Sequence, residues 1–355
     1  MIQLIVRSLG GEGLSLAARM AAAMLTALLI GVFGGGRLIV WLRSRNLAER
    51  TEKTPIEDPA LVARIAAKSG TPTMGGLIIL AALAPACLLW GRLDNLYLWM
   101  ALACFGALAA MGMADDWMKL TGRTHGDRGL KVRHKLLIQF AVGAALGLVY
   151  WLRLRSSGPP AWCPGAWGRW LLRLGPLLAI AWVSLVVATM SNAVNVTDGM
   201  DGLAGGLTLA SLAPLAILAY GPRLADLQGC DLAAQETALF CAALAGAVMG
   251  FLWHNVHPAQ VFMGDTGSLA IGGSLGLVAV MVRADLLMPL IGLVFLAEFA
   301  SSVMQVLYFK ATGRRILPIA PLHHIWQQRG VPEQRIVARF WLVGLAAALT
   351  PLVLL

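Results

Sequence analysis

The sequence has few charged residues and no long polar region. Asp, Glu, Lys and Arg make up 13% of its 355 residues, whereas a soluble domain carries roughly a quarter. The longest polar stretch, 42–74, contains too little apolar material for a core of its own. Hydrophobic residues make up 58% of the chain, so the composition excludes an ordinary soluble domain and indicates a protein of the lipid bilayer.

Long apolar segments recur along the whole chain, without a clear internal repeat. A helix that crosses the hydrocarbon of a membrane needs about 20 mostly apolar residues, because every backbone polar group must bond within its own segment. The first segment is too long for a removable signal peptide. We therefore predict an all-α, polytopic integral membrane protein with about ten transmembrane helices, in which residues 1–355 form a single domain. The ten segments are 17–41, 75–93, 95–114, 136–152, 174–191, 203–220, 237–253, 268–284, 286–308 and 337–355.

Acidic residues are scarcer than basic ones, 18 against 28, which gives a net charge of +10. The cations gather in three connecting segments, 42–74, 115–135 and 309–336, which ten spans place on one face. Because cytoplasmic segments hold excess Lys and Arg, this face is predicted to be cytoplasmic and both termini external, although segment 153–173 departs from the rule. Topology and attraction to anionic lipid headgroups explain the charge without nucleic acid.

The five cysteines do not form a cluster that would suit a thiolate metal site. Cys87, Cys104 and Cys241 lie in apolar segments, where we expect inert packing residues. Cys163 and Cys230 both lie in connecting segments that are predicted to be external. Whether these two form a disulfide stays open, since the sequence does not show that they meet.

Several acidic residues lie at one end of an apolar segment, and each time it is the predicted cytoplasmic end. The stretches are "MADDWMK" (113–119), "NAVNVTDGMDGLAGG" (192–206) and "FMGDTGS" (262–268). Acidic residues scattered among helix centres would have favoured an ion path. Their position at one face favours a site, and carboxylates with amides suit a hard cation such as Mg²⁺.

Each of these stretches also has a plainer interpretation. Asp115, with Lys119 four residues later, could be an ordinary ion pair at a helix end. The second stretch could be a turn, although four amide or carboxylate groups in ten residues exceed what a turn needs. Asp265 could simply cap the helix that begins beside it. Since neighbours on a helix point about 100° apart, Asp115 and Asp116 need not share one role.

Three further polar features lie near the same face. "KSGTPTMGG" (68–76) could hold an anion at the start of its helix, or merely start that helix. In "PIAPLHHIWQQRG" (318–330), His323 and His324 follow a basic run, and their imidazoles could donate to phosphate oxygens. The ninth apolar segment carries a polar stripe that is predicted to face the bundle interior: Glu298, Ser301, Ser302 and Gln305.

Five stretches, in their order and spacing, resemble those of the phospho-N-acetylmuramoyl-pentapeptide transferases: "KSGTPTMGG", "ADDWMK", "NAVNVTDGMDGLAGG", "VFMGDTGSLA" and "APLHH". That family belongs to the polyprenyl-phosphate N-acetylhexosamine-1-phosphate transferases, and the resemblance runs from about residue 38 to the C-terminus. It implies ten helices in the bacterial inner membrane, with the active site at the cytoplasmic face. The implied reaction transfers phospho-MurNAc-pentapeptide from UDP-MurNAc-pentapeptide to undecaprenyl phosphate, yielding UMP and lipid I for peptidoglycan synthesis.

The resemblance also implies roles for individual residues. Asp265 matches the family's Mg²⁺ ligand, and Asp115 and Asp116 match its essential acidic pair. His323 and His324 complete the implied catalytic set. The matches to the nucleotide-binding loop are Asn195, Asp198 and Asp201. The other substrate-binding residues that the resemblance implies are Lys68, Thr73, Lys119, Lys135, Asn255 and Phe262.

The chain departs from the family pattern at Ile325, where a third histidine is usual. The implied partners are the two substrates and membrane lipids, while a homodimer stays open. One alternative function is that of a sister transferase, which would load UDP-GlcNAc or a similar sugar for teichoic acid or O-antigen synthesis. A more distant alternative is a transporter with acidic coupling residues, which would place polar groups nearer the membrane centre.

Overall fold

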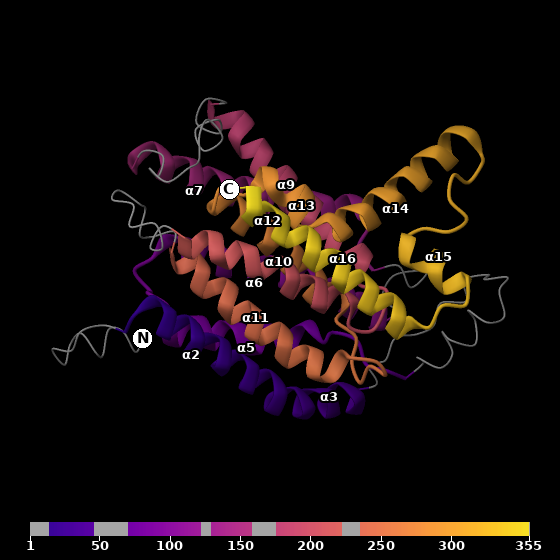
Figure 1. Cartoon of the computed structure of the whole chain (residues 1–355), viewed down its shortest axis with the longest axis horizontal. Helices are drawn as coiled ribbons and strands as arrows, with labels where there is room; N and C mark the ends of the chain where they lie inside the picture. Colours follow the sequence, from indigo (N-terminus) through magenta and orange to yellow (C-terminus); the bar gives the residue numbers. More distant parts are fainter. Residues whose placement is uncertain (1–13, 46–69, 122–128, 158–174, 222–234, 355) are drawn as a thin grey trace.

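The structure is a computed structural model, which describes residues 14–45, 70–121, 129–157, 175–221 and 235–354. The regular secondary structure of these residues is helical (Figure 1). Nine of the described helices are long and apolar enough to cross a membrane, and another apolar helix, Gly76–Trp90, is shorter. The prediction of an all-α, polytopic membrane protein is therefore confirmed.

The first crossing consists of three consecutive pieces: α2 (Leu16–Leu29), the π-helical turn η1 (Ile30–Gly34) and α3 (Gly35–Ser44). The other long helices are α5 (Gly76–Trp90), α6 (Leu96–Thr121), α7 (Val132–Ser157), α9 (Gly175–Thr197), α10 (Leu203–Tyr220), α11 (Gln235–Asn255), α12 (Gly264–Met281), α14 (Leu293–Thr312) and α16 (Glu333–Leu354). Three short helices complete the described structure: η4 (Asp285–Leu287), α13 (Met288–Ile291) and α15 (Leu322–Gln328).

Each of the ten predicted segments coincides with helix, but the two helices that carry the acidic and amide stretches continue well past the predicted end. α6 runs to Thr121 instead of residue 114, and α9 runs to Thr197 instead of residue 191. The added turns are polar, and they stay helical because their side chains find partners on neighbouring helices. The carboxylates and amides of these turns are therefore carried by rigid helices.

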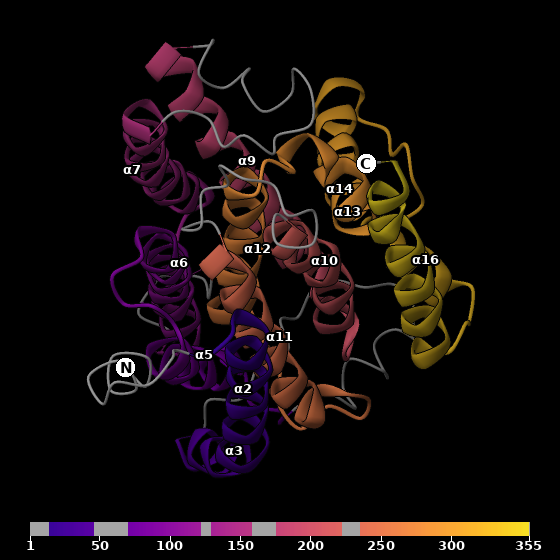
Figure 2. The ribbon, with the colours of Figure 1, turned by 60° about the vertical axis from the view of Figure 1, so that its left-hand side comes forward.

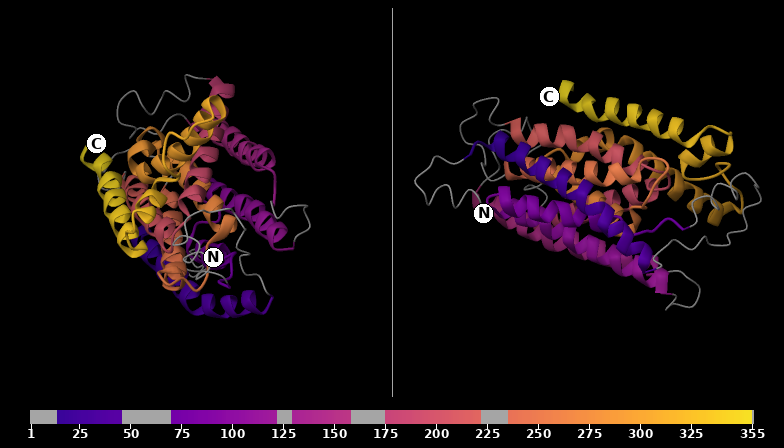
Figure 3. Two further views of the ribbon diagram at one scale, coloured as in Figure 1. Left: turned by 90° about the vertical axis from the view of Figure 1, so that its right-hand side faces the viewer. Right: turned by 90° about the horizontal axis from the view of Figure 1, so that it is seen from below.

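α12 lies at the centre of the bundle, where it packs against α6, α9 and α5 (Figure 2). Its residues from Asp265 to Met281 are all buried. Glycines allow this close packing, because a Cβ on Gly272 would lie 2.3 Å from the backbone oxygen of Met190 on α9. Small residues at helix contacts are the usual solution in membranes. The helices run side by side along the long axis of the molecule, as the right-hand view of Figure 3 shows.

The two ends of the described chain lie at the same end of the bundle. α2 begins and α16 ends on the left in Figure 1, as an even number of crossings requires. α14 leans away from the other helices toward the upper right of Figure 1, so that side chains such as Leu307 and Phe309 are exposed. Which face of this bundle is cytoplasmic stays a prediction.

A buried ion pair joins three helices at the end where α2 begins. Arg19 on α2 donates to both carboxylate oxygens of Glu236 on α11, at 3.0 and 2.5 Å. Arg19 also donates to the backbone oxygen of Trp90, at the end of α5, at 3.1 Å. The backbone N–H of Arg92 donates to Glu236 at 3.0 Å. Because both charges are buried, each depends on the other for compensation.

Arg19→Leu is expected to lower the free energy of unfolding by roughly 3–5 kcal/mol, because it leaves the carboxylate of Glu236 buried without its counter-ion. The measurement is the thermal midpoint of the detergent-solubilised protein. The double variant Arg19→Leu/Glu236→Leu is the matched control and should regain most of the loss. A single variant as stable as the wild type would show that the pair does not hold these helices together.

Candidate functional site

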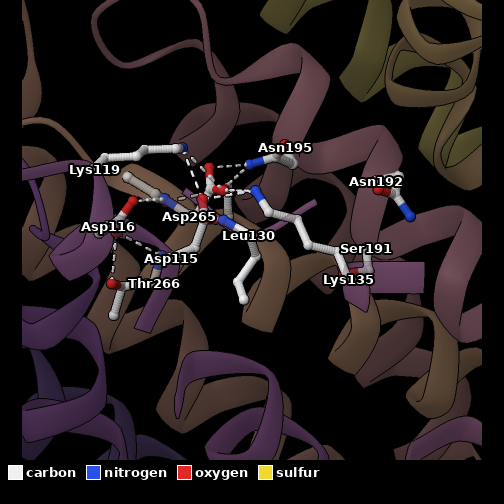
Figure 4. A network of polar contacts seen from close by, with 12 residues as sticks. Asp115, Asp116, Lys119, Leu130, Lys135, Ser191, Asn192, Asn195, Asp265 and Thr266 are labelled. Atoms are coloured by element: carbon white, nitrogen blue, oxygen red, sulfur yellow. Dashed lines mark hydrogen bonds and ion pairs between the residues drawn. The ribbon is translucent and has the colours of Figure 1, made fainter. Parts of the chain in front are cut away.

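Three carboxylates converge where α6 meets the beginning of α12 (Figure 4). Asp115 and Asp116 lie near the end of α6, and Asp265 lies in the first turn of α12. All three side chains are buried, and one oxygen atom of each lies within 4.8 Å of the others. The close approach depends on Gly112, because a Cβ there would lie 2.1 Å from the backbone oxygen of Asp265.

Asp116 caps the N-terminus of α12 from the neighbouring helix. Its carboxylate accepts hydrogen bonds from the backbone N–H groups of Asp265, at 3.1 Å, and Thr266, at 3.0 Å, and from the Thr266 hydroxyl at 2.7 Å. The first N–H groups of a helix have no partner within it, and a negative charge there is favourable. The interpretation of Asp265 as the cap of this helix is therefore wrong.

Asp115 and Asp265 instead face two lysines. The Nζ atom of Lys135, on α7, lies 2.7 Å from Asp115 and 2.6 Å from Asp265. The Nζ atom of Lys119 lies 2.8 Å from Asp115 and 3.3 Å from Asp265. The expected pair of Asp115 and Lys119 is confirmed, but it is not a solvated pair at an ordinary helix end, because Asp115 is fully buried. The backbone N–H of Leu130 also donates to Asp115, at 2.6 Å.

The amide stretch at the end of α9 contributes Asn195 to this cluster. Its Nδ2 atom donates to Asp265 at 2.8 Å and to the hydroxyl of Ser268 at 2.9 Å. Asn192, one turn earlier, donates to Gln139 of α7 at 2.8 Å. Gln139 in turn donates to Ser191 at 3.0 Å, so that α7 and α9 are joined beside the cluster.

Gln139 and Ser268 were not among the predicted site residues. Gln139 is fully buried, and the sequence does contain a signal for it, since a lone amide in the apolar segment 136–152 needs a partner. Ser268 carried no such signal, because hydroxyls in a helix commonly bond to their own backbone. Its hydroxyl does so here, donating to the backbone oxygen of Gly264 at 2.9 Å.

Asp201 and Asn255 belong to a second polar group. Asp201 accepts from His257 Nδ1 at 2.9 Å and from the backbone N–H of Ala259 at 3.2 Å. Its own N–H donates to Glu333, in the first turn of α16, at 2.8 Å. These bonds link the "DGMDG" loop to the segment after α11 and to the start of α16. Three of these residues bring ligand atoms within 4.8 Å of one another: Asp201, His257 and Glu333.

Asn255 ties the same loop to the segment that leads into α12. Its Oδ1 atom accepts from the N–H of Gly202 at 3.0 Å, and its Nδ2 atom donates to the backbone oxygen of Val261 at 2.8 Å. Asp198 is half-buried and lies directly after the end of α9. The nucleotide-binding residues predicted from the resemblance therefore lie partly on a helix and partly in a loop that is fixed from both sides.

Thr73 and Phe262 lie on two backbone segments that pair with each other. The N–H of Phe262 donates to Pro72 at 2.8 Å, and the N–H of Gly75 donates back to Phe262 at 2.7 Å. Thr73 and Asp116 both approach Gly264, whose φ of 71° favours glycine. The predicted Lys68 lies outside the described residues, as do Cys163 and Cys230.

The two adjacent histidines have different surroundings. His323 is fully buried; its backbone N–H donates to Glu298 at 3.1 Å, and its Nδ1 atom lies 3.2 Å from the same carboxylate. The ring also lies against Gly199, where a Cβ would be 2.5 Å from Nε2. His324 is half-buried, and its Nδ1 atom lies 3.0 Å from Gln327 Oε1. Burial and the neighbouring His323 lower the pKa of His324, which favours the neutral imidazole.

The predicted polar stripe on α14 faces inward over its first half. Glu298 and Ser301 are buried, and Gln305 accepts from the backbone N–H groups of Ile316 and Leu317. The stripe thus holds the segment that leads to α15. This segment carries the two histidines toward the "DGMDG" loop.

Comparison with known proteins identifies the family of the chain. A family model described as glycosyl transferase family 4 matches residues 98–283. The phospho-N-acetylmuramoyl-pentapeptide-transferase signature 1 matches residues 68–80. Curated proteins called phospho-N-acetylmuramoyl-pentapeptide-transferase are similar over most of their length. The one from Caulobacter vibrioides is 38% identical over 342 residues, which are 93% of this chain and 90% of the relative.

Two further relatives of the same name show similar values. That of Gemmatimonas aurantiaca is 39% identical and covers 94% of this chain and 92% of the relative. That of Salinibacter ruber is 38% identical and covers 95% and 92%. The chain belongs to the phospho-N-acetylmuramoyl-pentapeptide-transferase family. The resemblance predicted from five short stretches is confirmed over nearly the whole chain, while the roles of single residues stay predictions.

Gly112→Ala is expected to destabilise the protein by roughly 1–3 kcal/mol, because the added methyl group would press α6 and α12 apart beside Asp265. Gly106→Ala is the matched control on the same helix, since nothing lies within 4 Å of its Cβ position. The control should be neutral or slightly stabilising, as alanine favours helix. Equal thermal midpoints for the two variants would contradict the close contact.

Proposed function

We propose that the chain transfers phospho-MurNAc-pentapeptide from UDP-MurNAc-pentapeptide to undecaprenyl phosphate, with lipid I and UMP as products. The observation that carries the proposal is the buried cluster of Asp115, Asp265 and Lys135. There the Nζ atom of Lys135 lies 2.6–2.7 Å from the carboxylates of Asp115 and Asp265, which belong to different helices. The two carboxylates can therefore bind one cation together. The family of the chain and the names of its relatives support the same reaction.

The chemistry of this reaction suits a rigid, charged cluster. An oxygen of the lipid phosphate forms a bond to the β-phosphorus of the UDP-sugar, while the bond from that phosphorus to the α-phosphate oxygen breaks and UMP leaves. One phosphoanhydride replaces another, so catalysis depends mainly on positioning two polyanions and on neutralising their charge. Lys119 and Lys135 provide positive charge, and the buried cluster holds their ammonium groups in place.

We assign Mg²⁺ as the cofactor of this cluster. The donors are all oxygen atoms, which suits a hard cation, and the shared position of Lys135 Nζ marks where two carboxylates already bind a positive charge. Asp265 and Asp115 would hold the ion, whereas the carboxylate of Asp116 is engaged by three donors of α12. When bound, Mg²⁺ supplies charge neutralisation to the pyrophosphate of the donor.

The remaining residues receive roles from their surroundings or from the family resemblance. Besides holding the ion with Asp265, Asp115 is assigned to keep the attacking lipid phosphate deprotonated. Asp116 positions Asp265 by holding its backbone. His324 is the more exposed of the two histidines and contacts phosphate oxygens, while His323 fixes the loop. The residues assigned to the UDP-sugar are Lys68, Thr73, Asn195, Asp198, Asp201, Asn255 and Phe262.

We place the cluster at the cytoplasmic face of the bacterial inner membrane, where the soluble nucleotide is available. Cytoplasmic segments of membrane proteins are rich in Lys and Arg, and this rule supports the orientation. The described cations near the same end of the helices as the cluster are Arg43, Arg45, Lys131, Arg133, Lys310, Arg314 and Arg315. A homodimer stays a prediction.

The purified protein is expected to release UMP from UDP-MurNAc-pentapeptide only when a polyprenyl phosphate and a divalent cation are both present. EDTA should stop the release, and added Mg²⁺ should restore it, because charge neutralisation by the ion is part of the proposal. The assay follows UMP by chromatography. UDP-GlcNAc is the parallel substrate: if it were the better donor, the sister transferase would be the correct function, and activity after exhaustive chelation would contradict the metal.

Asp265→Asn is expected to lower turnover by about 100-fold or more, because it removes the charge that faces the cation but keeps the size of the side chain. Asp285→Asn is the matched control, since Asp285 is also buried but lies beyond the other end of α12, where it accepts a hydrogen bond from Trp182 at 2.7 Å. The control should keep its turnover. Near-normal turnover of Asp265→Asn, with an unchanged thermal midpoint, would remove Asp265 from the site.

A further inference from the structure

We infer that α15 and α16 form a binding site for an anionic phospholipid of the bilayer leaflet next to the carboxylate cluster. A groove with a volume of about 380 Å³ lies between these helices. Its walls are apolar except for Arg339. The lining residues are Trp326, Val331, Ile336, Arg339, Phe340, Leu342 and Val343. This inference does not depend on the proposed reaction.

The position of Arg339 is the first argument for an anionic occupant. Arg339 is exposed and lies within a membrane-crossing helix, six residues after Glu333, or about 9 Å along the helix axis. Within the described residues its side chain makes no hydrogen bond or ion pair. An arginine at this depth of a span needs an anionic partner or must extend to the interface. A lipid phosphate above the groove provides that partner.

Two further arginines extend the positive charge at the mouth of the groove. Arg329 stacks over the ring of Trp326, 5.6 Å from its centroid, and Arg335 is exposed one turn before Arg339. No acidic partner for either side chain lies among the described residues. Basic groups above an apolar slot between helices match the shape and charge of a phospholipid, whose phosphate meets the arginines while an acyl chain fills the slot.

The groove faces away from the candidate active site. Trp341 of α16 points into the bundle, where its Nε1 atom donates to the backbone oxygen of Leu203 on α10. At 100° per residue, Ile336 and Val343 lie about 140° and 160° around α16 from Trp341, and Phe340 lies about 100° from it, so the groove opens away from the side that Trp341 faces. Figure 2 shows α16 at the edge of the bundle, whereas α12 lies at its centre. A ligand in the groove therefore meets the bilayer and not the buried carboxylates.

The charge of this surface also argues against a second copy of the chain as the occupant. A symmetric dimer through the groove would bring the three arginines of one protomer close to the same three of the other, because a two-fold contact pairs a patch with itself. Glu333, the acidic residue in the first turn of α16, accepts from the backbone N–H of Asp201 instead. A negatively charged phospholipid supplies both a phosphate for the arginines and an acyl chain for the apolar slot.

The test measures quenching of tryptophan fluorescence by phospholipids with brominated acyl chains, in non-ionic detergent micelles. The protein contains 12 tryptophans, so the signal of the groove is the difference between the wild type and Trp326→Phe. Brominated phosphatidylglycerol should quench this signal at a mole fraction about fivefold lower than brominated phosphatidylcholine, a ratio expected from one arginine near an anionic lipid. Arg339→Gln should reduce the difference between the two lipids, because Arg329 and Arg335 remain at the mouth of the groove.

Arg45→Gln is the matched control, because Arg45 is exposed near the same end of the bundle and also stacks on a tryptophan, Trp41, but does not line this groove. It should leave the preference for phosphatidylglycerol intact. Equal quenching by both lipids in the wild type, or an unchanged preference in Arg339→Gln, would overturn the inference. Displacement of the brominated lipid by equimolar polyprenyl phosphate would also overturn it and assign the groove to that lipid. Absence of quenching by either lipid would mean that the groove is covered by protein.

Discussion

The cap that Asp116 places on α12 is the constraint on which the rest of the site depends. α12 is the central, fully buried helix, and its N-terminal residue provides no side-chain cap of its own. Unpaired N–H groups at a buried helix end would be costly, and the carboxylate of Asp116 satisfies two of them together with the Thr266 hydroxyl. The same bonds fix the backbone of Asp265. The bonds that hold α6 against α12 are therefore the same bonds that place Asp265 in the site.

The cap also determines how the other charges are arranged. Three buried carboxylates within 4.8 Å would repel one another strongly in a region of low dielectric. The repulsion is offset by the N-terminus of α12 at Asp116 and by Lys119 and Lys135 at the other two carboxylates. Lys135 comes from α7, which Gln139 fastens to α9. A chain with few charges thus concentrates several of them where helix ends meet.

The sequence predicts the helices well, because the need to satisfy backbone polar groups in lipid leaves a strong signal in each apolar segment. It also indicates that Asp115 and Asp116 need not share one role, since adjacent helical residues point in different directions, and their partners are different in the structure. It does not predict where α6 and α9 end, because the polar turns after residues 114 and 191 are held by tertiary contacts.

The partners of single side chains are harder to predict for the same reason. The sequence places Lys135 and Asp265 far apart, and only the packing of α7 against α9, and of α9 against α12, brings them within 2.6 Å. His257 binds Asp201, and nothing in the local sequence of His257 indicates that partner. Short motifs show that polar groups share a face of the membrane. They do not show which of them touch.

The buried acids divide by the kind of donor that each one meets. Glu298 acts in the same way as Asp116. It accepts a hydrogen bond from a backbone N–H at the start of another helix, α15, and so holds His323 in place. Asp265, in contrast, accepts only from side chains among the hydrogen bonds and ion pairs described here. A carboxylate bound to backbone N–H groups is fixed as part of the scaffold, since those donors cannot leave without unfolding a helix end. A carboxylate held by flexible lysines can exchange them for another cation. Asp265 is of this kind, and Asp115 keeps the same ability through Lys119 and Lys135, although it also accepts from the backbone N–H of Leu130.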